Sequence, residues 1–303
     1  MRIALLEICL VIALGFWVQP LCAAAGQTAP MPVAVSILPQ KYFVEKIGGN
    51  LVDVEVMVPP GATPEQYEPK PRQMSALDRS RIYFACGVPF EKVWLGKLVS
   101  ANPKIVVVHT EKDIAKRAIE AHSHHGEGAR PEGAGSQEET EDPHIWLSPP
   151  LGVLQARAIF DALAANDPQN RPSYETNYKG FVSELVDLDL YLSRLFAGAA
   201  KPGYFLVFHP AWGYFADAYG LRQVPVEVEG KEPKARELDE FIKHARELGV
   251  KVIFVQPQYS PRTAQTVADA VGGKLVEADD LAPDWDGNIR QVAGQIAAAL
   301  GRR

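Results

Sequence analysis

The sequence contains very little cysteine. Cys9 and Cys22 fall within the first 25 residues, so Cys86 is the only cysteine in the rest of the 303-residue chain. A single thiol excludes a disulfide framework within the chain, and it also excludes a metal cluster held by several sulfur ligands. Cys86 lies in the apolar segment IYFACG, where we expect a small buried hydrophobe. Any metal site must therefore use nitrogen and oxygen ligands.

Basic charge is also scarce. The chain has 31 Lys and Arg against 37 Asp and Glu, which gives a net charge of −6 and an isoelectric point near 5.7. No run of Lys and Arg forms a basic patch, and this excludes a nucleic-acid partner because phosphate binding needs one. The sequence also lacks an HExxH pair, a Ser or Cys nucleophile motif and a phosphate-binding loop. We therefore do not expect an enzyme.

Long hydrophobic runs are absent beyond the N-terminus. Residues 3–18 are apolar apart from Glu7, and the small residues Ala23, Ala24 and Ala25 follow. This pattern predicts a secretory signal over residues 1–25 and hence a periplasmic protein, because the apolar run is short for a membrane anchor. Lipid attachment at Cys22 is the weaker alternative, since a bulky leucine precedes that cysteine.

Short β-branched or aromatic segments alternate with longer helical ones, a pattern that predicts an α/β fold with mainly parallel strands. Four strands fall in each half of the chain, which indicates two similar lobes, each with flanking helices. We expect an N-terminal lobe over 26–170, a linking helix over 171–198 and a C-terminal lobe over 199–303. The expected strands span 31–37, 52–58, 81–87, 104–109, 204–209, 223–228, 251–257 and 274–279.

The segment between the two halves carries a regular apolar stripe. Its members recur at alternating spacings of four and three residues, which is typical of a long amphipathic helix. About 25 residues at 1.5 Å each would span roughly 38 Å, long enough to join two lobes. A coiled-coil dimer is the poorer alternative because few matched charges flank the stripe, so we expect a monomer. The stripe consists of Tyr174, Tyr178, Phe181, Leu185, Leu188, Leu192 and Leu195.

Residues 122–142 have a different composition, dominated by Gly, Ala, Glu and Pro without apolar periodicity. Such a segment cannot bury enough surface to offset its ordering entropy, so we predict a mobile loop. His122, His124 and His125 open the loop, and a His-rich tract binds zinc or nickel weakly in almost any context. The three histidines are therefore candidate auxiliary metal ligands, and a passive solvated linker is the alternative.

Four other side chains are candidate ligands because ligands gather beyond the carboxyl ends of parallel strands. His209 ends the strand at 204–209, Asp279 ends the strand at 274–279, Glu65 follows the strand at 52–58, and His144 follows the loop. Each has a structural alternative: His209 as a hydrogen-bonded histidine, Asp279 or its neighbour Asp280 as a helix cap, and Glu65 as a solvated carboxylate. Their convergence would require a cleft between the lobes.

Four motifs resemble those of one family: PPGATPEQYEPKPRQM, DPHIWLSP, HPAWGYFADAYGL and VEGKEPKARELDEFI. They are similar to the ZnuA/TroA-like metal-binding solute-binding proteins (cluster A-I) of bacterial zinc and manganese ABC importers. The resemblance covers essentially the whole chain after the signal. It implies two α/β lobes bridged by one long helix, a divalent metal held in the cleft as cargo, and a membrane permease as partner.

The resemblance also implies a ligand set. It places the second ligand at His144, the third at His209 and the fourth, a carboxylate, at Asp279. The chain departs from the family pattern G-x-x-P-H-x-Y, because Glu65 stands where relatives carry the first histidine. Glu65 is the expected replacement, and Gln66, water or a loop histidine are the alternatives.

Two imidazoles and two carboxylates form an oxygen-rich set that moves metal preference toward Mn²⁺ or Fe²⁺. Zn²⁺ nevertheless binds more tightly on intrinsic grounds, and the His-rich loop also favours zinc. We therefore expect zinc, with manganese or iron(II) as the alternative. A zinc-dependent hydrolase using Glu65 as general base and a surface adhesin are the remaining, weaker hypotheses.

Overall fold

The computed structural model describes residues 29–119, 141–198, 202–227, 233–259 and 261–301, and within them it contains two four-stranded parallel sheets. The N-terminal sheet has the order β2-β1-β3-β4 and the C-terminal sheet β6-β5-β7-β8, so the two share one topology. This confirms the predicted α/β fold class. The strands are β1 (Met31–Val35), β2 (Val52–Val56), β3 (Ile82–Ala85), β4 (Val106–His109), β5 (Gly203–Val207), β6 (Leu221–Pro225), β7 (Val252–Val255) and β8 (Lys274–Glu277).

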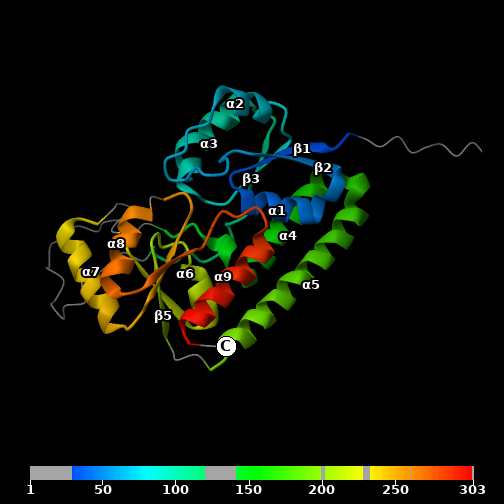
Figure 1. Cartoon of the computed structure of the whole chain (residues 1–303). Coiled ribbons are helices and arrows are strands. Elements are labelled where there is room, and N and C mark those ends of the chain that lie inside the picture. The colour runs from blue at the N-terminus through cyan, green and yellow to red at the C-terminus, as the bar shows by residue number, and fades with distance from the viewer. Residues whose placement is uncertain (1–28, 120–140, 199–201, 228–232, 260, 302–303) are drawn as a thin grey trace, which may run out of the picture.

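Helices follow the strands along the chain and cover the two sheets (Figure 1). Several begin with proline in the first turn. Backbone N–H groups in that turn have no acceptor within the helix, so a proline without an N–H loses no helical hydrogen bond there. Those of the first half are α1 (Leu38–Gly48), α2 (Pro71–Leu77), α3 (Pro89–Ala101), α4 (Pro149–Asn166) and α5 (Arg171–Phe196). Those of the second half are α6 (Gly213–Tyr219), α7 (Ala235–Glu247), α8 (Pro261–Val271) and α9 (Trp285–Ala299).

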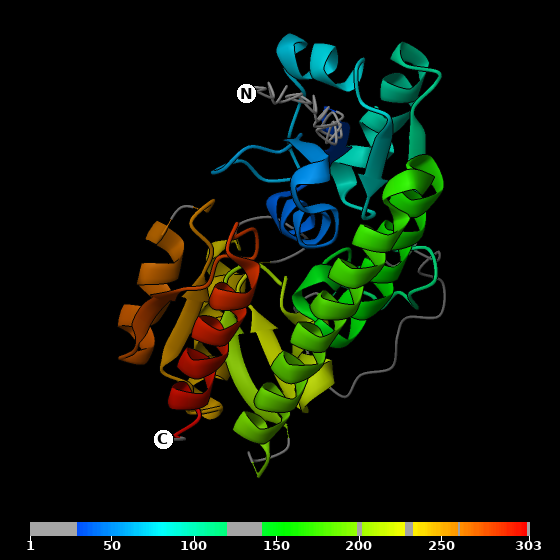
Figure 2. The same ribbon diagram turned by 90° about the vertical axis from the view of Figure 1, so that its right-hand side faces the viewer.

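Helix α5 is the long helix that the apolar stripe predicts. It runs for 26 residues beside both lobes, as the two views agree (Figures 1 and 2). It packs against α1, α4 and α9. Five of the seven stripe residues are buried, and the other two, Tyr178 and Leu195, are half-buried. Helix α5 therefore buries one face against elements from both halves of the chain.

Aromatic packing joins the two lobes beside α5. Phe43 of α1 contacts Phe181 of α5 and Trp285 of α9, with ring centroids 5.0 Å apart in both pairs. One hydrophobic core runs through these residues and continues into both sheets, while a smaller core lies beneath α7 and α8. Because packed interiors deform little, a wide opening of the lobes would have to break this shared core. The loops between the lobes are thus held on a stiff frame.

Two predicted segments lie outside the described residues: the signal at 1–25, which includes Cys22, and the part of the predicted loop that carries His122, His124 and His125. The last residue of that predicted loop, Asp142, is described and is buried, so the prediction of a mobile loop up to residue 142 is wrong at this end. Among the helices that the structure does describe, none combines the length and apolar character needed to cross a bilayer. Cys86 is buried, as its apolar segment predicts.

The inner face of α5 provides a stability prediction. Leu188 is fully buried, so Leu188→Ala should lower the free energy of unfolding by about 2–5 kcal/mol through lost burial and a residual cavity. Val186 lies two residues away with 46% of its surface exposed, and Val186→Ala should change stability by no more than about 0.5 kcal/mol. Urea denaturation of both variants measures the difference. Equal effects would show that α5 does not pack as described.

Candidate metal centre

Three of the predicted ligands converge between the two lobes. Glu65, His144 and His209 each offer a ligand atom, and these atoms lie within 4.8 Å of one another. The Nε2 atoms of His144 and His209 are 3.4 Å apart, and Oε1 of Glu65 is 3.9 Å from Nε2 of His209. Both histidines are buried, whereas Glu65 lies toward the open side. The three come from separate segments of the chain.

His209 is fixed by its backbone and by both sides of its ring. It follows β5, and the side chain of buried Gln256 accepts from its N–H (3.3 Å) and donates to its C=O (3.0 Å). Tyr259 stacks on the imidazole, with centroids 5.1 Å apart and an interplanar angle of 19°. Nδ1 lies 2.6 Å from Oε2 of Glu227, which is itself buried. The free edge of the ring, with Nε2, therefore points into the cluster.

His144 is held by the residues on either side of it. Oδ1 of Asp142 accepts from the backbone N–H of His144 (3.0 Å) and lies 2.8 Å from its Nδ1. The ring of Trp146 lies against the imidazole at 5.1 Å, and the Trp146 indole donates to the carbonyl of Asp280 at 2.7 Å. The stiff segment DPHIW thus orients His144 and connects it to the opposite lobe.

The buried carboxylates decide which nitrogen of each ring is available. A carboxylate only accepts, so the Nδ1 atoms that face Asp142 and Glu227 must carry the protons. In the neutral imidazoles this leaves both Nε2 atoms with lone pairs, and these face each other across 3.4 Å. Neither can donate to the other in this state, and a cation between them would satisfy both. Such a carboxylate behind each imidazole is typical of metal-bound histidines.

Glu65 is carried by the loop between β2 and α2. The backbone N–H of Phe90, at the start of α3, donates to the carbonyl of Pro64 at 3.0 Å. The ring of Tyr67 packs edge-on against Phe90, with centroids 6.0 Å apart. These contacts fix the loop on both sides of Glu65. Glu65 and the neighbouring Gln66 are both exposed.

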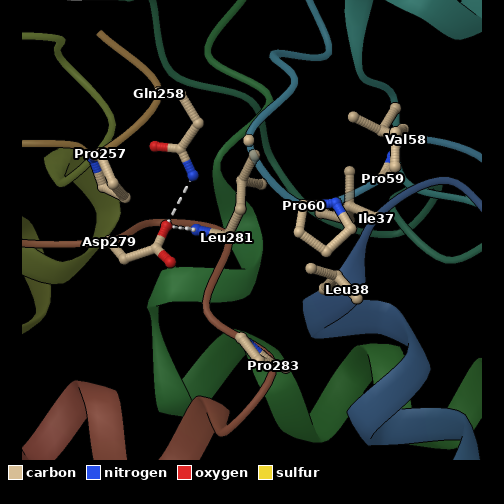
Figure 3. A pocket seen from close by; sticks show the side chains of 11 residues that line it. Ile37, Leu38, Val58, Pro59, Pro60, Pro257, Gln258, Asp279, Leu281 and Pro283 are labelled. Atoms are coloured by element: carbon tan, nitrogen blue, oxygen red, sulfur yellow. Dashed lines mark hydrogen bonds between the residues drawn. The ribbon is translucent and has the colours of Figure 1, made fainter.

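Asp279 lies outside the three-residue cluster. Its Oδ1 accepts from the side chain of Gln258 (2.8 Å) and from the backbone N–H of Leu281 (2.9 Å), as Figure 3 shows. Asp279 and Gln258 form the polar side of a cavity of about 240 Å³ between the lobes. Its apolar walls come from both halves of the chain: Ile37, Leu38, Val58, Pro59 and Pro60 on one side, and Pro257, Leu281 and Pro283 on the other.

The next residue, Asp280, also lies outside the three-residue cluster but is influenced by its charges. It is buried, with 5% of its surface exposed. Burial raises the pKa of Asp280 to about 7, an effect that nearby His209 opposes and the negative charges of Asp279 and Glu65 reinforce. The sequence indicated only a capping role for Asp280, because two adjacent aspartates at a strand end cannot be distinguished by spacing.

Comparisons with known proteins identify the family. The family model described as "Zinc-uptake complex component A periplasmic" matches residues 33–299. The chain is 29% identical over 257 residues to the high-affinity zinc uptake system protein ZnuA of Bacillus subtilis strain 168, covering 80% of this chain and 76% of that protein. It is 28% identical over 255 residues to the manganese ABC transporter substrate-binding lipoprotein PsaA of Streptococcus mitis, covering 81% and 78%.

Solved structures show the same fold. A crystal structure of a ZnuA deletion mutant with zinc bound superposes with a TM-score of 0.80 and 39% identity, covering 89% of this chain and 98% of that one. The match extends over both lobes and the long helix between them. The chain therefore belongs to the ZnuA family and is a ZnuA/TroA-like metal-binding solute-binding protein of the zinc and manganese ABC importer type.

Proposed function

We propose that this chain captures Zn²⁺ outside the inner membrane, between Glu65, His144 and His209, and delivers it to the permease of an ABC importer. The opposed Nε2 lone pairs, each backed by a buried carboxylate, carry the proposal. Two imidazoles and a carboxylate within 4.8 Å of one another suit a cation with tetrahedral coordination, which requires one further donor. The protein acts as a monomer in the periplasm, and the metal is its cargo.

We assign the further donor to the aspartate pair that follows β8. Asp280 is favoured because its carboxyl is buried and lies near enough to His209 and Glu65 to interact electrostatically with both. Asp279, the position implied by the resemblance, would first have to release Gln258 and the Leu281 N–H. The two aspartates are compared directly below.

Zinc is favoured over manganese for two reasons. Imidazole nitrogens suit Zn²⁺, which binds more tightly than Mn²⁺ to a given nitrogen and oxygen site, and the similar ZnuA deletion mutant has zinc bound. Manganese is the second candidate, because Glu65 adds a carboxylate where relatives have a histidine and because the similar PsaA protein is a manganese-binding one.

Removal of either histidine should abolish tight zinc binding. His209→Ala and His144→Ala each delete a ligand, and we expect losses beyond the 10–100-fold that an outer-sphere change typically causes. His244→Ala is the matched control, because that histidine lies on α7 with 46% of its side chain exposed. Calorimetric titration of metal-free protein with zinc measures all three. Wild-type-like binding by His209→Ala would overturn the assignment of the site.

The aspartate pair can be resolved by two conservative variants. Asp280→Asn should weaken zinc binding by about 10–100-fold because it removes a negative charge next to the cation. Asp279→Asn should leave zinc affinity nearly unchanged, since that side chain is directed to Gln258 and Leu281. The same calorimetry compares them. A larger loss in Asp279→Asn would show that Asp279 enters the coordination shell.

Glu65 provides a test of metal preference. Glu65→His restores the imidazole that relatives carry and makes the donor set softer, so it should raise the ratio of zinc to manganese affinity. Competition of the two metals for wild-type and variant protein, followed by metal analysis after removal of free ions, measures this ratio. An unchanged or lower ratio would show that Glu65 does not contact the metal.

A further inference from the structure

Asp142 has a second partner on the side away from His144. One of its oxygens is used by His144, while Oδ2 lies 3.6 Å from Nη1 of Arg117. The carboxylate of Asp142 is completely buried, and the Arg117 side chain is mostly buried. Nε of Arg117 lies 3.1 Å from Oδ2 of Asp217, on α6 of the second half of the chain. Arg117 thus connects α6 to the carboxylate that orients a metal-site histidine.

The guanidinium of Arg117 occupies space that only a glycine leaves open. Gly213 is the first residue of α6, and a Cβ atom there would lie 1.4 Å from Nη1 and 2.6 Å from Cζ of Arg117. The same Cβ would lie 2.9 Å from Oδ2 of Asp142. Any larger side chain at position 213 would therefore displace the guanidinium from Asp142.

Backbone contacts hold Arg117 and Asp142 side by side. The N–H of Asp142 donates to the carbonyl of Arg117 at 2.9 Å, and Ala118 and Glu141 form an antiparallel bridge. The hydroxyl of Tyr214 accepts from the Arg117 N–H (3.1 Å) and donates to the Asp142 carbonyl (3.0 Å). Side chains of α6 therefore contact the side chain of Arg117 and the backbone of both Arg117 and Asp142.

We propose that Arg117 is a positioning residue for metal capture, which holds Asp142 so that Asp142 presents Nε2 of His144 to the cation. The inference rests on the proposed function. Removing one partner of a buried ion pair leaves an uncompensated charge, which is strongly unfavourable. Without Arg117, Asp142 turns away from its buried position and the Nδ1–H of His144 loses its acceptor. Arg117 in this way couples the placement of α6 to a ligand from the other half of the chain.

Arg117→Gln tests this role. We expect a 10–100-fold loss of zinc affinity, the effect typical of a residue that orients a metal ligand. Gly213→Ala should act in the same direction while keeping the arginine, because the new methyl group displaces the guanidinium. The matched controls are Arg157→Gln, which removes an exposed arginine paired with Asp161, and Gly180→Ala, where a Cβ meets open space on α5. Both controls should bind zinc like the wild type.

Two further measurements separate positioning from a general loss of structure. In metal-free protein, NMR should show a downfield Nδ1–H signal for His144, and Arg117→Gln should remove it while leaving the corresponding His209 signal. In an Asp142→Asn background, Arg117→Gln should cause little additional loss of zinc affinity, because the carboxylate through which Arg117 acts on His144 is already absent.

Wild-type zinc affinity in Arg117→Gln, or an unchanged His144 signal in that variant, would overturn the inference. So would additive losses in the double variant. These outcomes are distinct from failure of the proposed function, in which the wild-type protein itself would not bind zinc. The NMR comparison uses metal-free protein and therefore tests the placement of His144 in either case.

Discussion

The opposition of two imidazoles, each fixed from behind by a buried carboxylate, is the constraint on which the centre depends. Asp142 and Glu227 hold the protons on the Nδ1 atoms of His144 and His209, and the two Nε2 lone pairs are left 3.4 Å apart. A cation between the two rings would accept both lone pairs. A mobile histidine could rotate away from its neighbour, whereas these two are buried and hydrogen-bonded in place. In the proposed site, groups that do not touch the metal would therefore contribute to its affinity.

The frame around the centre is stiff because the lobes share a core. The contacts of Phe43 with Phe181 and Trp285 bring α1, α5 and α9 together, and the core continues from them into both sheets. The donors are carried by short segments that emerge between the lobes. Glu65 is the exposed member of the three candidate ligands and is therefore the one most accessible to an incoming ion.

The interaction of Arg117 with Asp142 extends the centre into the second half of the chain. The arginine approaches Asp142 only because Gly213 lacks a side chain, and Tyr214 of the same helix contacts the backbone on both sides. In our proposal, a candidate ligand from one half, His144, is positioned through Arg117 by a helix from the other. This arrangement makes α6 part of the metal centre's support, although none of its residues is a candidate ligand.

The sequence by itself determined the eight strands, the long helix with its apolar stripe and the family, because these depend on local periodicity and on contiguous motifs. It also identified Glu65, His144 and His209 as candidates, since each follows a strand or a loop at a recognisable position. Only the tertiary structure decided which of Asp279 and Asp280 is buried, and that Glu227 lies against His209 and Arg117 against Asp142. The physical reason is that adjacent aspartates look alike in a sequence, while charge compensation and hydrogen bonding to a buried ring are set by residues tens of positions apart that meet only when both lobes pack.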